Sequence, residues 1–304
     1  MPPNVSFVVV TWESEKDLES LISSMNSFLP DPGRIELIVV DNASTRDPGE
    51  TARSWKGPVE IDRLESNLGF GAASNRGVAK AHSPVTVLCN PDIRLIDDSI
   101  LDLCELAMER NALAGPRLLW PDGSDQPSAS GPVTGLWPWI GAVVPGAVQP
   151  EPMLRKTEAW RCSETVPVEW LTGALVAGPT ELLRALGPFD ERIELMAEDL
   201  DLCLRAGDRG ITCLFAPEVA TAIHTGGTSR ERRFDDGGLA LAARNRDEVI
   251  ARSRGTGAAR RARSAQSLRL RLRIVAKSLL KADAARERAE LEAMESSSGI
   301  PHPG

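Results

Sequence analysis

The sequence predicts an α/β fold built on a doubly wound, mostly parallel central sheet. Over about the first 115 residues, short apolar runs rich in β-branched residues alternate with segments of helical periodicity. The runs are continuous, as in strands that helices cover on both faces. Polar side chains directly follow several of them. In a parallel sheet such side chains gather at one edge, where folds of this class bind their ligands.

The elements of the first half follow in chain order. Val5–Val10 is a short β-branched strand, and Asp17–Phe28 has apolar residues at positions 18, 21, 22 and 25, which predicts a helix. We then expect the strands Ile35–Val40 and Val59–Leu64, the helix Ala72–Ala81, the strand Val85–Cys89 and the helix Ser99–Arg110. Such alternation is typical of parallel β-α-β units.

The second half is less regular. Proline and glycine punctuate residues 116–165, so we expect an irregular excursion there that covers an acceptor site. A strand pattern resumes over Val166–Ala177, and Glu181–Leu186 has the composition of a helix that ends at the following Gly-Pro. Two further apolar runs, Cys213–Phe215 and Val219–Ile223, close the core.

These elements predict one domain over residues 1–235. The resemblance to a known family described below implies a nucleotide-binding half (1–115) and an acceptor-binding half (116–235). A basic helical C-terminal extension (236–295) and a disordered tail (296–304) follow. Residues 252–281 contain Lys and Arg but no acidic residue, and Leu268, Leu272, Val275 and Leu279 recur there at helical spacing. Two interpretations stay open: a helix packed on the core, or peripheral contact of residues 252–281 with an anionic membrane surface.

Composition excludes several classes of protein. An apolar content of 42% and a charged content of 26% are ordinary for a soluble globular chain. The five cysteines form no C-x-x-C pair, which favours reduced thiols. No apolar stretch approaches the ~20 residues that span a bilayer, and no basic patch precedes the first strand as in a signal peptide. The net charge of −8 argues against a nucleic-acid partner. We expect a cytoplasmic protein, at most peripheral on the inner face of the cell membrane.

Polar clusters end three of the predicted strands. They are Thr11, Asp41 and the Asn90-Pro91-Asp92 turn, and we expect them to converge on one edge of the sheet. Asp41 has a structural interpretation as a turn or capping residue, and Asp92 as a turn residue. In a nucleotide site, however, Asp41 can accept the imide N–H of a pyrimidine base. Asp92 can supply a carboxylate oxygen to a divalent cation that bridges two phosphates.

Glu198–Arg205 is the most informative segment. Three of its residues are acidic and fall in the first turn of a predicted helix, which by itself suits the helix dipole. The segment lies between Phe189-Asp190-Glu191 and a histidine, His224, that two glycines follow one residue later. Because glycine lets backbone approach phosphate, His224 is a candidate second metal ligand. A carboxylate base, a metal-binding acid and a histidine are what sugar transfer from a nucleotide needs.

Residues 69–74 nearly match the dinucleotide-binding pattern G-x-G-x-x-G/A. The third position is Ser74, the motif follows the third predicted strand rather than the first, and the acid about twenty residues on is Asp92 of the Asn-Pro-Asp turn. A dehydrogenase is therefore disfavoured. A glycine-rich helix start, or a backbone that passes close to a bound nucleotide sugar, accounts for the segment better.

Together the motifs resemble the inverting glycosyltransferases of family 2, which have the GT-A fold. The nearest subgroup is the bacterial rhamnosyltransferase-like enzymes that build cell-wall or surface polysaccharide. Each motif alone is weak, and their order and spacing over roughly residues 5–230 carry the resemblance. The matching segments are Val8–Trp12, Val40–Ser44, Asn67–Gly71, Asn75–Gly77, Asn90–Asp92, Trp170–Gly173, Phe189–Glu191, Glu198–Arg205 and His224.

The resemblance implies a role for each matching position. Asp199 matches the catalytic base, Asp92 stands in the family's D-x-D metal motif, and His224 matches a histidine that joins the Mg²⁺ or Mn²⁺ ion in some members. The implied acceptor-binding residues are Trp170, Gly173 and Glu198. The implied residues of the donor nucleotide site are Thr11, Trp12, Glu13, Asp41, Ser44, Asn67, Gly69, Arg76 and Asn90.

The chain departs from the family pattern at three places. Trp12-Glu13 replaces the usual Tyr-Asn, which bears on stacking of the nucleoside. Asn90 replaces the first Asp of D-x-D and leaves one charge fewer on the metal. Ile193–Ala197 lacks the aromatic residues usual before the catalytic acid, so the acceptor contacts differ.

The implied reaction is inverting transfer of a sugar, best matched by rhamnose from dTDP-rhamnose, to a saccharide or lipid-linked saccharide hydroxyl. Two alternatives stay open: the same fold with a UDP-hexose donor, and a catalytically silent protein that binds sugar nucleotides. A nucleotidyltransferase is disfavoured because no glycine-rich, Lys-bearing loop follows the first strand. A homodimer is compatible with the sequence, which does not reveal the oligomeric state.

Overall fold

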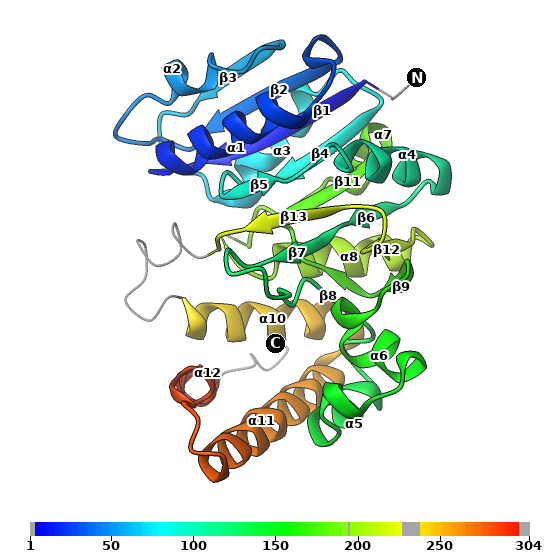
Figure 1. Cartoon of the computed structure of the whole chain (residues 1–304). Helices are drawn as coiled ribbons and strands as arrows, with labels where there is room; N and C mark the ends of the chain where they lie inside the picture. The colour runs from blue at the N-terminus through cyan, green and yellow to red at the C-terminus, as the bar shows by residue number, and fades with distance from the viewer. Residues whose placement is uncertain (1–3, 194, 227–237, 298–304) are drawn as a thin grey trace.

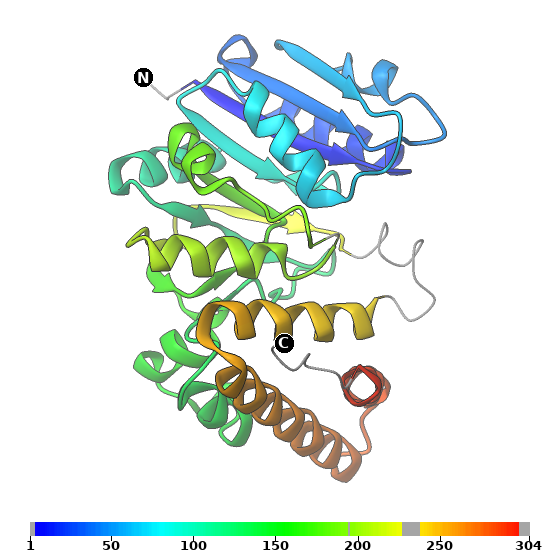
Figure 2. The same cartoon turned by 180° about the vertical axis from the view of Figure 1, so that it is seen from behind.

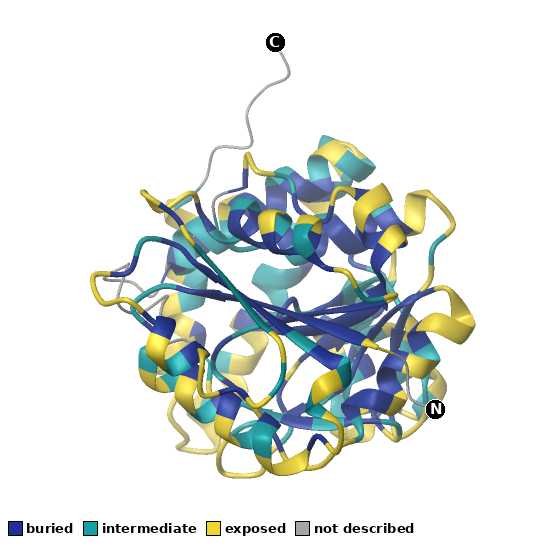
Figure 3. Ribbon diagram, turned by 90° about the horizontal axis from the view of Figure 1, so that it is seen from above, coloured by how far each residue is buried: buried dark blue, intermediate teal, exposed yellow. Residues whose placement is uncertain are grey.

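A computed structural model describes residues 4–193, 195–226 and 238–297. At its centre is an eight-stranded sheet with the strand order β3-β2-β1-β4-β11-β6-β12-β9 (Figure 1). Its strands are β1 (Val5–Thr11), β2 (Ile35–Asp41), β3 (Val59–Arg63), β4 (Val85–Cys89), β6 (Leu113–Gly115), β9 (Val166–Val168), β11 (Leu175–Pro179) and β12 (Cys213–Phe215). Figure 3 shows these strands as the buried centre of the molecule.

The predicted mostly parallel sheet is confirmed. β1 pairs in parallel with β2 and with β4, and β2 pairs in parallel with β3. β11 is the exception in the middle of the sheet, because it runs antiparallel to β4 and to β6. Its reversed direction brings the residues just before it to the edge where β1, β2 and β4 end.

Helices cover both faces of the sheet, as continuous apolar strands require. Alternate residues of β1 point to opposite faces, so Phe7 packs in a core cluster with α1 and α4, and Val8 packs in a second cluster with α3, α7 and α8. The helices are α1 (Glu15–Phe28), α2 (Gly49–Ala52), α3 (Phe70–Lys80), α4 (Ile100–Arg110), α7 (Thr180–Leu186) and α8 (Glu198–Asp208). A 3₁₀ turn, η1 (Pro32–Arg34), precedes β2.

Two small sheets flank the central one. The first has the order β5-β13-β7 and consists of β5 (Ile93–Leu95), β13 (Thr221–His224) and β7 (Arg117–Leu119). The second pairs β8 (Ala129–Ser130) with β10 (Trp170–Leu171). In the first sheet His224 is the register partner of Ile93, so residues far apart in the chain meet next to the Asn90-Pro91-Asp92 turn.

Residues 116–165 are more regular than we expected. Besides β7 and β8 they contain α5 (Trp137–Val143), α6 (Glu151–Thr157) and the 3₁₀ turns η2 (Gly146–Val148) and η3 (Ala159–Arg161). Both helices carry proline at their first or second position, where its missing N–H leaves no hydrogen bond unmade. The prolines of residues 116–165 predict irregular structure, but two of them, Pro138 and Pro152, lie in the first turns of helices.

The predicted C-terminal helical extension is confirmed. It consists of α10 (Leu239–Arg254), α11 (Thr256–Leu279) and α12 (Ala285–Ser296), which lie beyond the β9 end of the central sheet (Figures 1 and 2). α10 packs on α8, and α11 packs on α5, α10 and α12. Most of the predicted tail, residues 298–304, and the predicted domain boundary at 235 lie outside the described residues. None of the described helices combines the length and apolarity that a bilayer crossing requires.

Candidate active site

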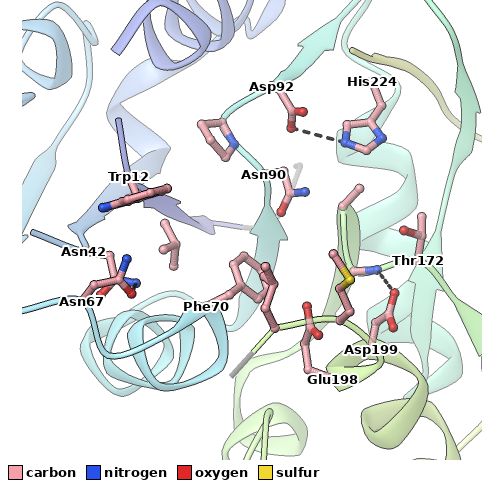
Figure 4. A pocket seen from close by; sticks show the side chains of 16 residues that line it. Trp12, Asn42, Asn67, Phe70, Asn90, Asp92, Thr172, Glu198, Asp199 and His224 are labelled. Carbon is pink, nitrogen blue, oxygen red and sulfur yellow. Dashed lines mark hydrogen bonds and ion pairs between the residues drawn. The ribbon is translucent and has the colours of Figure 1, made fainter. Parts of the chain in front are cut away.

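A cavity of about 260 Å³ lies at the carboxyl edge of β1 and β4. Figure 4 shows that its side chains come from the strand ends on one side and from the start of α8 on the other. Of the predicted site residues it brings together Trp12, Asn67, Asn90, Asp92, Gly173, Glu198, Asp199 and His224. The predicted convergence of strand-end residues therefore holds for the segments after β1 and β4.

Asn42 organises the donor side of the cavity. Its side-chain amide donates to Asn67 Oδ1 at 2.9 Å and to the Gly69 carbonyl at 3.2 Å, and its Oδ1 accepts the Leu68 N–H at 2.8 Å. These bonds hold the 67–69 turn against the end of β2, with Gly69 at a φ of +88°. We did not predict Asn42 as a site residue. The signal was present, since Asn42 lies between the predicted residues Asp41 and Ser44.

Asp41 is fully buried and does not line this cavity. Its Oδ1 accepts the Ser44 N–H at 3.1 Å, and its Oδ2 lies 3.2 Å from Arg63 Nε. That Oδ2 has no hydrogen-bond partner among the described residues. Its contact with a nucleobase stays a prediction.

Of the other residues predicted to bind the nucleotide, Glu13 and Ser44 connect two loops, and Arg76 forms an ion pair. The Glu13 carboxylate accepts both the N–H and the hydroxyl of Thr45 at 2.7 Å, and Ser44 Oγ accepts the Glu13 N–H at 3.0 Å. These bonds tie the loops after β1 and β2 together. Thr11 is buried, and Arg76 makes a bidentate pair with Asp62. Neither lines the cavity.

Asp92 and His224 face each other at the cavity wall (Figure 4). Asp92 Oδ1 lies 3.3 Å from His224 Nε2, while Asp92 Oδ2 accepts the Gly226 N–H at 3.0 Å. On the far side of the ring, His224 Nδ1 lies 2.7 Å from Gln126 Oε1. Because an amide oxygen only accepts, Nδ1 carries the hydrogen of the neutral ring. His224 Nε2 and Asp92 Oδ1 then each present a lone pair to the other, with no hydrogen between them. A cation bound by both atoms stabilises this arrangement.

The residues therefore fit a divalent cation. Imidazole nitrogen and carboxylate oxygen are ordinary ligands of Mn²⁺, and a carboxylate also suits Mg²⁺. Asn90 Oδ1 is buried and has no hydrogen-bond partner among the described residues, which leaves an oxygen free for a ligand. No group of three or more His, Cys, Asp or Glu in the described ranges forms a metal site of its own.

Glu198 and Asp199 form the first turn of α8. Asp199 Oδ2 accepts the Gly173 N–H at 3.0 Å, and its Oδ1 accepts the Leu200 N–H at 2.7 Å. Gly173 is needed at this close approach, since a Cβ there would lie 3.2 Å from Asp199 Cβ. Glu198 is 9% exposed, and its Oε2 has no hydrogen-bond partner in the part of the chain that the structure describes.

Glu198 and Asp199 differ in protonation state because their hydrogen-bond partners differ. Burial, and to a lesser extent the charge of the neighbouring Asp199, together raise the pKa of Glu198 to about 8. Burial also raises the pKa of Asp199, but hydrogen bonds from the Gly173 N–H, the Trp170 side chain and the Leu200 N–H oppose the rise. These donors stabilise the charged form, so at neutral pH Glu198 holds the proton and Asp199 is the carboxylate.

A short loop before α8 presents this pair. Met196 and Ala197 both have a φ of +69°, which is strained for residues with a Cβ. Asn245 of α10 stabilises the loop by donating to the Leu195 carbonyl at 2.8 Å and to the Met196 carbonyl at 3.3 Å. Trp170, predicted to bind the acceptor, does not line the donor cavity and lies in a second cavity beyond Asp199.

The comparisons with known proteins agree with this architecture. Residues 6–134 match the model of Glycosyl transferase family 2. The chain is 28% identical over 244 residues to the N-acetylglucosaminyl-diphospho-decaprenol L-rhamnosyltransferase of Mycobacterium tuberculosis, with 71% of this chain and 75% of that protein covered. The family match includes the strand-end residues that line the cavity, Trp12, Asn90 and Asp92.

Two solved structures share the fold. The mannosyltransferase PcManGT from Pyrobaculum calidifontis, in complex with GDP-Man and Mn²⁺, has a TM-score of 0.62 at 15% identity, with 98% of this chain and 86% of that chain covered. GalNAc-T7 with UDP, GalNAc and Mn²⁺ has a TM-score of 0.57 at 18% identity. The match covers 82% of this chain but only half of the GalNAc-T7 chain.

The sheet and the helices that cover it have the GT-A fold. The family match over residues 6–134 and the similarity to a mycobacterial rhamnosyltransferase make the protein a glycosyltransferase that resembles the members of family 2.

Proposed function

We propose that this protein transfers a sugar from a nucleoside-diphosphate donor to an acceptor hydroxyl, with inversion at the anomeric carbon. One observation carries the proposal: the Asp199 carboxylate and the Asp92–His224 pair line the same cavity from opposite sides (Figure 4). A donor diphosphate held at Asp92 would then present its anomeric carbon toward Asp199. The strand-end position of Asn90 and Asp92 is where open α/β sheets bind phosphates and nucleotides.

In the proposed mechanism Asp199 acts as the general base. It takes the proton of the acceptor hydroxyl as the oxygen attacks the anomeric carbon from the face opposite the nucleotide. The bond from the anomeric carbon to the diphosphate oxygen breaks in the same step, and the nucleoside diphosphate leaves. General-base assistance of this kind is worth roughly 10²–10⁴ in rate.

We propose that Asp92 and His224 would hold Mg²⁺ or Mn²⁺ at this wall of the cavity, beside the donor diphosphate. The cation would neutralise the charge of the leaving group. Within this arrangement Gln126 keeps the imidazole oriented, and Gly226 keeps the second carboxylate oxygen of Asp92 in place. Asn90, in place of an acid, contributes a neutral oxygen.

We infer dTDP-rhamnose as the donor and a saccharide or lipid-linked saccharide of cell-wall or surface polysaccharide as the acceptor. The similarity to the mycobacterial relative supports this, since that protein is an L-rhamnosyltransferase whose acceptor is linked to decaprenol through a diphosphate. UDP in the GalNAc-T7 structure favours the alternative of a UDP-hexose donor. The substitutions at Glu13 and Asn90 keep a silent binding protein as the alternative of another class.

A donor panel tests the proposal. Thermal unfolding is followed with dTDP-, UDP- and GDP-sugars, each with and without Mn²⁺. We expect a shift with a pyrimidine nucleotide sugar that Mn²⁺ increases, followed by nucleoside diphosphate release when a lipid-linked or oligosaccharide acceptor is added. No shift with any pyrimidine nucleotide sugar would count against the enzyme. A shift without release for any acceptor would favour the silent binder.

We also propose peripheral contact of α11 with an anionic membrane on its cytoplasmic side. Val275 and Leu279 are 55% and 79% exposed on a helix whose basic residues include the exposed Arg271. We expect Val275→Asp and Leu279→Asp to reduce co-sedimentation with anionic vesicles severalfold. Phe28→Asp, on α1 at the opposite end of the molecule in Figure 1, should leave it unchanged. Equal sedimentation of all four proteins would contradict the proposal.

A further inference from the structure

A second cavity, of about 720 Å³, lies between the acceptor-binding half and the C-terminal helices. Its walls come from β8, β10, the start of α8, and α10, α11 and α12. Glu198 and Asp199 line both this cavity and the donor cavity. The proposed base therefore stands at the boundary between them, where an acceptor that enters through the second cavity would reach it.

Basic side chains from three helices line the second cavity. They are Arg246 of α10, Arg269, Arg273 and Lys277 of α11, and Arg286 of α12. Two of these cations have carboxylates of their own: Lys277 lies 2.7 Å from Glu287, and Arg286 lies 3.0 Å from Glu290. The charge of the other three cations is only partly neutralised.

Arg269 and Arg273 share one carboxylate. Both pair with the buried Glu158, which Arg161 also contacts at 2.6 Å. The single negative charge of Glu158 is therefore shared by the guanidinium groups of Arg161, Arg269 and Arg273. Arg269 Nε is buried and has no hydrogen-bond partner in the described part of the chain. Burial lowers the pKa of Arg269, and the neighbouring Arg273 lowers it further, as expected where positive charge is in excess.

Arg246 is paired more weakly still. Its ion pair among the described residues is with Asp247, at 3.9 Å, and Asp247 is engaged more closely by Arg263. No hydrogen bond joins the Arg246 guanidinium to any described residue, although burial lowers its pKa. A guanidinium with no close anion among the described residues is suited to an anionic ligand.

The same cavity also has a surface suited to a sugar. The aromatic rings of Trp160 and Trp170 line it, and an indole offers an apolar face against which a pyranose ring can pack. Trp170 hydrogen-bonds to Asp199, so a sugar on Trp170 would have a hydroxyl close to the base. On the outside of α11, Leu272 and Val275 are exposed on either side of Arg273 in the sequence.

We propose that the second cavity binds a lipid diphosphate saccharide as the acceptor, with its sugar at Trp170 and Asp199 and its diphosphate on Arg246, Arg269 and Arg273. This assignment rests on the proposed function of the donor cavity. Guanidinium groups match pairs of phosphate oxygens in a planar fork, and three of them suit a group with two phosphorus centres. The exposed apolar residues of α11 would contact the lipid chain.

Binding of farnesyl diphosphate to the full chain tests the site without any donor chemistry. Titration calorimetry is carried out with saturating UDP and Mn²⁺, so that the donor cavity is filled. We expect the parent protein to bind farnesyl diphosphate. Arg246→Gln and Arg273→Gln should each weaken binding by about tenfold or more, because each removes charge-assisted hydrogen bonds to phosphate.

Arg271→Gln is the matched control on α11. Its side chain is 61% exposed, pairs with Glu295 at 2.8 Å and does not line the cavity, so its affinity should equal that of the parent. Inorganic diphosphate serves as the second probe. Tighter binding of farnesyl diphosphate than of inorganic diphosphate supports a lipid-linked ligand. Equal binding of the two would overturn the lipid part of the assignment.

Two outcomes overturn the proposal as a whole. They are no binding of farnesyl diphosphate by the parent protein and parental affinity in both arginine variants. Arg273 is 48% exposed, so its variant should fold even where the Arg246 variant does not. Loss of donor binding together with intact, arginine-dependent farnesyl diphosphate binding would count against the proposed function and not against this site.

Discussion

Two adjacent carboxyl groups in one cavity take opposite protonation states because their hydrogen-bond donors differ. Asp199 has the N–H groups of Gly173 and Leu200 as donors, whereas Glu198 Oε2 has no partner among the described residues. The proton therefore stays on Glu198, whose pKa is about 8, and the charge stays on Asp199. This division leaves one carboxylate to act as base without a second negative charge beside it.

Glu198 makes folding stability depend on pH. Its pKa is about 8 in the folded protein against 4.5 as the ordinary value, so the folded state holds more protons than the unfolded state between these values. Stability contributed by Glu198 is present in full below pH 4.5 and is lost as pH rises toward 8. We expect Glu198→Gln to raise the free energy of unfolding relative to the parent by on the order of 2–4 kcal/mol more at pH 8 than at pH 5.

Denaturant unfolding at pH 5 and pH 8 measures this difference. Glu292→Gln, at an exposed position of α12, is the control and should give equal changes at both pH values. A Glu198→Gln protein whose stability follows the parent at both pH values would show that Glu198 is ionised in the folded state.

Asp199→Asn tests the base directly. The amide keeps the size of the side chain but does not accept a proton, so we expect the transfer rate to fall by roughly 10²–10⁴. Donor binding should persist, because Asp92 and His224 lie on the other side of the cavity. Rates come from nucleoside diphosphate release, and donor binding comes from the thermal shift. Asp102→Asn, exposed on α4, is the control; substantial turnover by Asp199→Asn would remove Asp199 from the role of base.

At the level of elements, strand direction assembles the site. Antiparallel β11 begins where β4 ends, so the Asn90 N–H donates to the Ala174 carbonyl at 2.8 Å and Gly173 reaches Asp199. Pairing of β13 with β5 places His224 beside Asp92. Close packing of α3 on β1 supports the 67–70 segment that lines the donor cavity.

Gly77 allows that packing. A Cβ at Gly77 would lie 2.3 Å from Val8 Cγ1, so we expect Gly77→Ala to destabilise the protein by about 1–3 kcal/mol as α3 is pushed from the sheet. Gly207, in α8, has open space where its Cβ would stand, so Gly207→Ala should stabilise by about 0.5–1 kcal/mol. Denaturant midpoints compare the two helix glycines. Equal effects would contradict this account of α3.

At the level of the whole molecule, the C-terminal helices pack against the segment that presents Asp199. Asn245 of α10 holds the loop before α8, and Arg254 pairs with Asp208 at 2.6 Å and with Glu169 at 3.4 Å. Because α10 contacts the loop before α8 and the start of β10, it helps to determine where Asp199 lies. The helix-packing interpretation of the basic segment is therefore supported, and the membrane interpretation applies only to its exposed face.

Asn245→Ala should therefore change catalysis from outside the cavity. Without its two hydrogen bonds the strained Met196-Ala197 turn is free to relax, and we expect kcat to fall about tenfold, a loss of ~1.4 kcal/mol in transition-state stabilisation. The thermal shift with donor and Mn²⁺ should be unchanged. Arg244→Ala, exposed on the same helix, is the control. Parental kcat in Asn245→Ala would show that the loop keeps its shape unaided.

The sequence predicted some residues of the candidate site better than others. Asn90 and Asp92 were predicted because their turn directly follows an apolar run, a local pattern in the sequence, whereas Trp12 and Asn67 were assigned from the family resemblance. Arg76 was assigned to the nucleotide from its place in a motif, yet its side chain pairs with Asp62 of β3. Only the packing of α3 against β3 supplies that partner.

The sequence by itself determined the alternating strands and helices, the edge of the sheet that holds the donor cavity, and the Glu198-Asp199 pair. These follow from hydrophobic periodicity and from residues adjacent in the chain, which are local properties. The reversed direction of β11, the contact of His224 with Gln126, and the basic cavity under α10–α12 were decided only by the tertiary structure. Each depends on contacts between segments far apart in the chain, and no local pattern encodes them.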